Sequence, residues 1–205
     1  MRLLLLLVLT ACGDASVAAA PSKAAAPAAE GLAVAVFAGG CFWCMEAPFE
    51  KLAGVVSVES GYTGGPEIGP TYHAVARGAT GHFEAIRVVF RPDEVGYSKL
   101  LSVFWHNVDP TQANGQFCDK GDQYRTAIFV GTPGEKTLAE SSKKMIEGAL
   151  ERPVVTPVLD ASTFWLAEDY HQDFYKKNPT RYHSYRAGCG RDKRLEQLWG
   201  NLAGS

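Results

Sequence analysis

The segment that most constrains the fold is LAVAVFAGGCFWCMEAPFE, residues 32–50, because a short apolar run passes directly into a helical pattern. The run at 32–40 ends in two glycines, which is typical of a buried strand before a sharp turn. Pro48 predicts that a helix begins close to Cys44, since proline is tolerated only in the first turn of a helix. Cys41 therefore lies between the turn and the helix.

The rest of the chain mixes strand and helix signals without strict alternation. Strands are predicted at 55–65, 84–90, 124–130 and 153–160, and helices at 98–108, 134–150, 167–178 and just after Cys189. This mixture favours an α+β fold: a single domain with a central mixed β-sheet flanked by helices.

The first residues, MRLLLLLVLTAC, predict a lipoprotein-type signal peptide that spans residues 1–12. Its apolar run is far too short to cross a bilayer as a helix, and its small residues before Cys12 resemble a bacterial lipobox. We expect Cys12 to carry the lipid of an exported protein. Residues 13–31 are mostly Ala, Pro and Ser, which predicts a flexible tether, and residues 32–205 form the folded domain.

Charge and cysteine content narrow the possible partners. The formal net charge is -2 and the basic residues are dispersed, which argues against a nucleic-acid partner.

Apart from the lipobox cysteine, the chain has Cys41, Cys44, Cys118 and Cys189. Disulfides are allowed in an exported protein, but spacing alone does not give the pairing.

The motif Cys41-Phe42-Trp43-Cys44 allows several interpretations. A cysteine just ahead of a helix meets unpaired N–H groups and the positive end of the helix dipole, both of which favour a thiolate, although position alone leaves an inert buried thiol equally open. The two preceding glycines would let a substrate approach the backbone closely. Zinc is disfavoured, since the other cysteines bring no second ligand pair, and we predict no metal. A thioredoxin-like exchange centre remains open, although Phe42 and Trp43 form a wide apolar wall.

Six motifs, in this order, resemble the peptide methionine sulfoxide reductase A family: GCFWCMEAPFE, GYTGG, PTYHAV, TGHFEAIRVVF, NGQFCDKGDQYRTAIF and AEDYHQDF. They extend from about Val34 to Pro179. The resemblance implies the α+β fold of that family and reduction of the S epimer of methionine sulfoxide, free or within proteins. It also implies Cys41 as the nucleophile, no cofactor and an external thioredoxin-like reductant. Phe42 and Trp43 would hold the methyl group of the substrate.

The same resemblance implies roles for further residues. Glu84 would protonate the sulfoxide oxygen, because a carboxyl in an apolar pocket keeps its proton near neutral pH. Tyr72 and Tyr124 would donate hydrogen bonds to that oxygen as the S–O bond breaks. Asp119 would order a tyrosine or a water in the pocket, and His171 would have a supporting role.

A second thiol must resolve the sulfenic acid that Cys41 would acquire. Many family members have glycine at the position of Cys44 and carry their resolving cysteine in a Gly-rich C-terminal tail, so this chain departs from the common pattern. Cys189 lies between glycines that would let it move, which favours it slightly. Cys44 is close in sequence, so closing its disulfide costs little entropy. Cys118 is interpreted as a structural thiol.

Together these observations predict a peptide-methionine (S)-S-oxide reductase that repairs oxidised methionine in exported proteins. We expect a periplasmic lipoprotein that is a monomer and contacts the membrane only through its lipid anchor. The alternative is a CxxC protein that exchanges disulfides with other proteins and needs neither Glu84 nor the pocket tyrosines.

Overall fold

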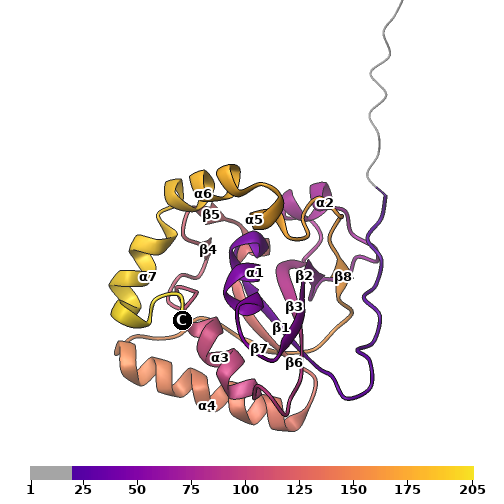
Figure 1. Ribbon diagram of the computed structural model, residues 1–205. Helices are drawn as coiled ribbons and strands as arrows, with labels where there is room; N and C mark the ends of the chain where they lie inside the picture. The colour runs from indigo at the N-terminus through magenta and orange to yellow at the C-terminus, as the bar shows by residue number, and fades with distance from the viewer. Residues whose placement is uncertain (1–19) are drawn as a thin grey trace, which may run out of the picture.

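The computed structural model describes residues 20–205, so the predicted signal peptide, Cys12 and the first part of the predicted tether lie outside the described residues. A mixed sheet of six strands forms the centre of the domain, in the order β7-β6-β1-β3-β2-β8 (Figure 1). In this sheet β6 and β7 pair in parallel and the other neighbours are antiparallel. The strands are β1 (Ala33–Gly39), β2 (Val55–Thr63), β3 (Phe83–Phe90), β6 (Thr126–Val130), β7 (Val158–Asp160) and β8 (Trp165–Leu166).

Helices flank this sheet, and their arrangement confirms the predicted α+β fold in a single domain (Figure 1). Within residues 20–205, no helix is both long enough and apolar enough to cross a lipid bilayer. The helices are α1 (Phe42–Glu50), α2 (Tyr72–Ala76), α3 (Tyr97–Trp105), α4 (Pro133–Leu150), α5 (Phe174–Lys177), α6 (Pro179–Gly188) and α7 (Arg191–Trp199). A separate ribbon consists of β4 (Gly115–Gln116) and β5 (Asp119–Lys120), and short 3₁₀ turns lie at Asp122–Tyr124 and Gly200–Leu202.

The sheet has apolar packing on both faces, because successive side chains of a strand point to opposite sides. On the helix-covered face, the ring of Phe37 stacks with those of Phe49 in α1 and Phe104 in α3, at centroid distances of 5.3 and 5.2 Å. On the other face, Ala38 belongs to a buried cluster with Phe129. This double-sided core fixes the position of α1 and of the turn that precedes it.

Part of the predicted tether lies against the domain, beside β8 (Figure 1). The Ala25 N–H donates to the Phe164 carbonyl, and the Leu166 N–H donates to the Lys23 carbonyl, both at 2.8 Å. Small side chains bury little surface, but their backbone groups can still pair with an open strand edge. Residues 22–25 of the predicted tether therefore pair with the folded domain, upstream of the predicted boundary at residue 32.

Helix α1 differs from the prediction in where it starts. It begins at Phe42, directly after Cys41, and Pro48 lies inside it rather than in its first turn. Proline has no N–H, so the Cys44 carbonyl lacks the donor that a helix normally provides four residues later. The helix therefore contains Cys44 within its first turn and presents Cys41 as its N-cap residue.

The predicted helix at 167–178 is shortened to α5, and turns replace its first half. The Glu168 carboxylate forms tertiary hydrogen bonds: it accepts one from the Tyr72 N–H at 2.8 Å and one from the Tyr62 hydroxyl at 2.9 Å. Asp173 takes a φ of 54°, which interrupts a right-handed helix. The prediction also misses α6, whose sequence PTRYHSYRAG has no clear apolar period.

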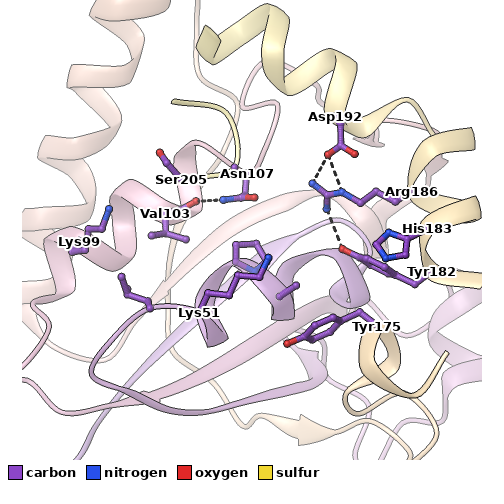
Figure 2. A pocket seen from close by; sticks show the side chains of 14 residues that line it. Lys51, Lys99, Val103, Asn107, Tyr175, Tyr182, His183, Arg186, Asp192 and Ser205 are labelled. Atoms are coloured by element: carbon purple, nitrogen blue, oxygen red, sulfur yellow. Dashed lines mark hydrogen bonds and ion pairs between the residues drawn. The ribbon is translucent and has the colours of Figure 1, made fainter. Parts of the chain in front are cut away.

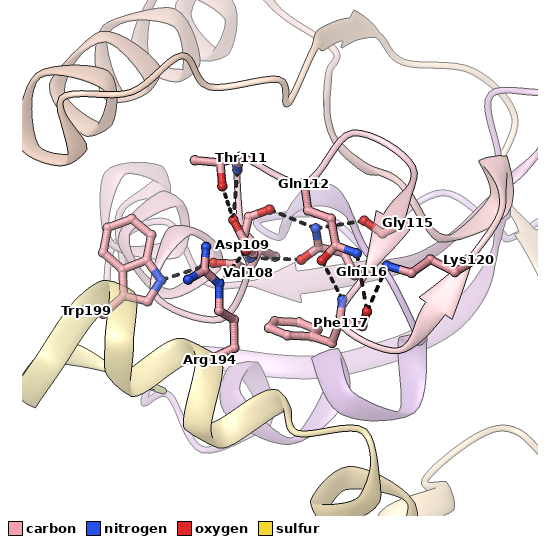
Figure 3. A network of polar contacts seen from close by, with 10 residues as sticks. All are labelled: Val108, Asp109, Thr111, Gln112, Gly115, Gln116, Phe117, Lys120, Arg194 and Trp199. Atoms are coloured by element: carbon pink, nitrogen blue, oxygen red, sulfur yellow. Dashed lines mark hydrogen bonds and ion pairs between the residues drawn. The ribbon is translucent and has the colours of Figure 1, made fainter.

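Helix α7 confirms the predicted closing helix, and it fixes the loop that leads to Cys118 (Figure 3). Arg194 Nε pairs with Asp109 Oδ2 at 2.7 Å. Trp199 Nε1 donates to the Val108 carbonyl at 3.0 Å. The segment after Cys189 therefore holds one side of the region that carries the candidate site.

Candidate active site

A small pocket of about 80 Å³ lies at the N-terminal end of α1. Its lining residues are Cys41, Phe42, Trp43, Tyr72, Glu84, Asp119, Tyr124 and Tyr185. The structure thus brings together the predicted nucleophile, the predicted proton donor, both predicted tyrosines and the apolar wall, from separate elements of the chain. Tyr185 is the lining residue that the sequence does not identify, because it lies in α6, beyond the last motif.

The turn between β1 and α1 places Cys41 at this pocket. Gly40 has a φ of 79°, and a Cβ there would lie 2.5 Å from the Cβ of Gln116. Gln116 is itself fixed, since its amide donates to the Asp109 carbonyl and accepts the Asp109 N–H, both at 2.8 Å (Figure 3). The absence of a side chain at Gly40 therefore accommodates Gln116 rather than an approaching substrate.

Glu84 lies in β3 and is only 2% exposed. Its Oε2 accepts the Phe42 N–H at 3.3 Å, which places the carboxyl beside the residue that follows Cys41. Burial raises the pKa of Glu84 to about 8; the hydrogen bond from Phe42 opposes this rise and the charge of Asp119 adds to it. The carboxyl therefore carries a proton at neutral pH and can act as an acid.

Tyr72 and Tyr124 present two phenols to the same pocket. Tyr72 is the first residue of α2, which is capped by the Thr71 hydroxyl accepting the Ala74 N–H at 3.3 Å. Burial and the charge of Glu84 raise the pKa of Tyr72 to about 12, and the same two causes raise the pKa of Tyr124. Both phenols therefore stay protonated and can donate hydrogen bonds to a substrate oxygen.

Trp43 forms part of the apolar wall, and residues outside the pocket lining hold its ring in place. Its ring stacks on Phe174 with centroids 3.7 Å apart, and its Nε1 donates to His171 Nδ1 at 3.0 Å. Burial lowers the pKa of His171 to about 4, so the imidazole is neutral and Nδ1 can accept this bond. His171 therefore orients Trp43 from outside the pocket lining.

Asp119 and Tyr185 connect the pocket to the second pair of cysteines. The Tyr185 hydroxyl donates to Asp119 Oδ2, and the Tyr185 ring meets Trp43 edge-on at a centroid distance of 5.9 Å. The other carboxyl oxygen of Asp119 lies 3.8 Å from Cys118 Sγ. Burial raises the pKa of Asp119, while the bond from Tyr185 opposes that rise. Asp119 thus orders a tyrosine, and that tyrosine is Tyr185.

Cys41 and Cys44 are free thiols and are only 5% and 1% exposed. Burial, followed by the hydrogen bond with Cys44, raises the pKa of Cys41. The hydrogen bond from Cys41 lowers the pKa of Cys44 to about 6 against the effect of burial, and Arg191 and Arg186 assist. The hydrogen bond within the pair thus favours the proton on Cys41 and the negative charge on Cys44 while both thiols are free.

Cys118 and Cys189 form a disulfide between the turn of the β4–β5 ribbon and the end of α6. Cys118 is exposed and Cys189 is half-buried. Cys189 lies between α6 and α7, which gives it less freedom than its flanking glycines suggest. The two sulfurs and the Asp119 carboxyl lie within 4.8 Å of one another, but a disulfide offers no thiolate to a metal ion.

A larger cavity of about 480 Å³ lies between α1, α3, α6 and α7 (Figure 2). In it Arg186 pairs with Asp192 and donates to the Tyr182 hydroxyl at 3.3 Å, and Lys51 and Lys99 also contribute to the lining. Its lining contains no cysteine. The smaller pocket, which joins a thiol to a protonated carboxyl, is therefore the candidate active site.

A family model described as peptide methionine sulfoxide reductase matches residues 33–203. A peptide methionine sulfoxide reductase MsrA from Bacillus licheniformis is 49% identical over 174 residues, which cover 84% of this chain and 96% of that protein. Mxr1 from Saccharomyces cerevisiae, solved in reduced form, is 28% identical with a TM-score of 0.69, and the match covers 73% of this chain and 87% of that one. Mxr1 solved in complex with Trx2 is 17% identical, with a TM-score of 0.53, and the match covers 75% of this chain and 91% of that one. This similarity concerns the fold alone.

Proposed function

The chain belongs to the peptide methionine sulfoxide reductase A family and is a peptide-methionine (S)-S-oxide reductase, and we propose that Cys41 and Glu84 perform its chemistry. The observation that carries this proposal is the convergence of a thiol, a protonated carboxyl and an apolar wall on one pocket. Such chemistry needs no bound cofactor, because the thiol itself supplies the electrons.

The first step transfers the sulfoxide oxygen to Cys41. The sulfoxide sulfur becomes electrophilic when its oxygen gains a proton, and Glu84 holds a proton at neutral pH. Attack by the Cys41 sulfur breaks the S–O bond of the substrate. In balance, the Cys41 thiol becomes a sulfenic acid and the sulfoxide becomes methionine.

The remaining pocket residues would orient the substrate. Tyr72 and Tyr124 would donate hydrogen bonds to the sulfoxide oxygen while its negative charge develops. Phe42 and Trp43 would contact the methyl group on the sulfur, which selects methionine sulfoxide over more polar sulfoxides. The accepted substrates would be free methionine-S-sulfoxide and oxidised methionine in proteins.

For the resolving thiol, the structure favours Cys44 over Cys189. Cys44 is a free thiol close to Cys41, and the hydrogen bond from Cys41 lowers its pKa, whereas Cys189 is bonded to Cys118. The Cys44 thiolate would attack the sulfenic sulfur, form the disulfide with Cys41 and release hydroxide, which takes up a proton to give water. We therefore propose Cys44 as the resolving cysteine, in place of Cys189, which the sequence slightly favours.

The second cysteine pair would then regenerate the first by thiol–disulfide exchange. In the reduced state, the thiols of Cys118 and Cys189 would transfer two electrons to the disulfide between Cys41 and Cys44, and would become the disulfide seen in the structure. Cys118 is exposed, so an external thioredoxin-like dithiol can reach it. The existence of a complex between Mxr1 and Trx2 supports a reductant of this kind.

The cellular setting of the enzyme is proposed from residues 1–12. They support export, a lipid on Cys12 and repair of oxidised proteins in the periplasm. The protein would act as a monomer, with no nucleic-acid partner. If this is right, Cys12→Ser should move the enzyme from the membrane fraction to the soluble periplasmic fraction without loss of activity; unchanged fractionation would contradict lipidation.

Counting methionine formed without any reductant tests the proposed chemistry. When Cys41, Cys44, Cys118 and Cys189 are all reduced, the enzyme should yield about two methionines per chain from the S epimer. It should yield about one when Cys118 and Cys189 start as a disulfide. No methionine from the S epimer would refute the proposal. Reduction of insulin disulfides that is unaffected by Glu84→Gln, in the absence of sulfoxide turnover, would instead support the CxxC exchange alternative.

A further inference from the structure

Arg191, the first residue of α7, is buried beneath the catalytic turn with 1% of its surface exposed. Its Nη2 donates to the carbonyls of Gly39 at 3.1 Å and Asn107 at 2.8 Å, and lies 3.0 Å from Met45 Sδ. Its guanidinium also lies over the ring of Phe117, 4.4 Å from the centroid. Each of these contacts is neutral, so none of them balances the positive charge.

A buried charge of this kind is costly unless an anion compensates it. Within residues 20–205, no carboxylate lies at ion-pair distance from Arg191. Its Nε is buried without a hydrogen-bond partner. The guanidinium therefore has unused capacity to stabilise a negative charge that develops nearby.

The contacts of Arg191 identify where such a charge would form. Met45 directly follows Cys44 and Gly39 lies two residues before Cys41, so the guanidinium contacts both ends of the turn that carries the cysteine pair. The positive charge of Arg191 lowers the pKa of Cys44 and that of Asp119. Of these two groups, Cys44 is the one that the proposed reaction requires as an anion.

Other groups also face Cys44, and their effects differ in sign. Its pKa is lowered by the hydrogen bond from Cys41 and by the charges of Arg191 and Arg186, and is raised by burial and by Asp119. Glu84 and Tyr182 respond to the charge of Cys44 as well. Arg186 is already paired with Asp192, which leaves Arg191 as the cation without an ion pair.

We propose that Arg191 is a positioning residue that holds Cys44 as a thiolate for attack on the Cys41 sulfenic acid. This inference rests on the proposed function, with Cys44 as the first resolving thiol. In the step that it assists, the Cys44 sulfur forms a bond to the Cys41 sulfur, the S–O bond breaks, and hydroxide leaves as water after protonation. The thiolate is oxidised and the sulfenic sulfur is reduced, so no other oxidant or reductant is required.

The direct test measures the ionisation of Cys44 in the full chain with the disulfide intact and Cys41→Ser in place. Thiolate absorbance in the ultraviolet is followed against pH, and alkylation with mass spectrometry assigns the transition to Cys44. Arg191→Met should raise the midpoint by on the order of one to two pH units, because a unit charge is removed from a buried site. Arg191→Lys should keep the midpoint close to that of Cys41→Ser alone.

A matched control separates this effect from loss of folding. Arg194 is also in α7, but it forms an ion pair with Asp109. Arg194→Met should therefore reduce stability without moving the midpoint of the Cys44 titration. An unchanged midpoint in Arg191→Met, or an equal shift in Arg194→Met, would overturn the proposal.

A kinetic test separates this inference from the proposed function. In the chain with its native Cys41, Arg191→Met should form the first methionine at the normal rate, whereas the sulfenic acid trapped by dimedone should persist on the order of tenfold longer at neutral pH. A normal sulfenic lifetime would overturn the role of Arg191. Absence of methionine formation in the wild-type enzyme would instead refute the proposed function.

Discussion

Cys41 and Cys44 lie in one helical turn, buried and free, whereas Cys118 and Cys189 are 71 residues apart, bonded to each other, and reach the surface. The near pair is brought together by local backbone geometry, and it lies beside the carboxyl and the phenols of the pocket. The distant pair meets only because the ribbon, α6 and α7 fold against one another. One pair is thus suited to react with a substrate, and the other to exchange with a partner protein.

The sharpest test of this division compares single serine variants of the two pairs. Cys41→Ser should lower methionine formation by at least about a thousandfold, since no other thiol occupies the pocket. Cys118→Ser should leave the first turnover unchanged and should slow only the later turnovers with a thioredoxin-like reductant. Rapid-quench measurement of the first methionine distinguishes the two variants. A slow first turnover in Cys118→Ser would contradict the assignment of the substrate reaction to the near pair alone.

The next largest effect should follow from Glu84→Gln, which removes the proton donor beside the near pair. We expect the rate of the first turnover to fall by about a hundredfold or more, as for loss of a general acid. In the wild type this rate should decline as pH rises through about 8, because Glu84 then loses its proton. A pH profile that is identical in Glu84→Gln would contradict this role.

The raised pKa of Glu84 also has a consequence for stability. Its ordinary pKa is 4.5 and its folded value is about 8, so the folded state binds more protons between these limits. Stability should therefore fall with rising pH across this window, by on the order of 1 kcal/mol per pH unit, and Glu84→Gln should remove that dependence. Denaturant unfolding at several pH values measures it, and a wild-type stability that is flat in this range would contradict the shift.

Removing the distant pair should affect stability more than the first turnover. The double variant Cys118→Ser with Cys189→Ser should lower the free energy of unfolding by about 2–4 kcal/mol, because the disulfide closes a long loop in the unfolded chain. Its count of methionines without reductant should be about one per chain, from Cys41 and Cys44. The fully reduced wild type should give about two, and a wild-type count of about one, equal to that of the variant, would show that the distant pair is not part of the electron path.

The near pair should depend instead on the turn before it. Gly40→Ala should destabilise the protein by about 1–3 kcal/mol, since the residue has a positive φ and a Cβ would meet Gln116. Gly148→Ala in α4 is the matched control: its Cβ would enter open space, and the change should be neutral or slightly stabilising. Equal effects of the two substitutions in thermal unfolding would contradict the role of the turn.

What the sequence could predict follows the same division between local and distant contacts. The strand, turn and nucleophile around Cys41 are encoded in adjacent residues, and short motifs identify Glu84 and Tyr72. Tyr185 and Arg191 could not be identified in this way, because they reach the site from the last two helices, where no motif marks them.

The two largest departures from prediction have a common physical cause. Residues 167–173 have helical spacing of apolar groups, but Glu168 and its neighbours are held by contacts with β2 and α2. Residues 22–26 have the composition of a tether, yet they pair through backbone groups that composition does not report. In both cases tertiary hydrogen bonds outweigh the local preference.

The pairing of residues 22–26 with β8 also changes how the molecule meets its neighbours. An open strand edge offers unpaired N–H and C=O groups to the strands of other molecules and can start aggregation. Lys23 and Ala25 occupy these groups at Phe164 and Leu166. The chain thus shields one margin of its own sheet, and a truncated protein that starts at residue 32 would leave that margin open to intermolecular strand pairing.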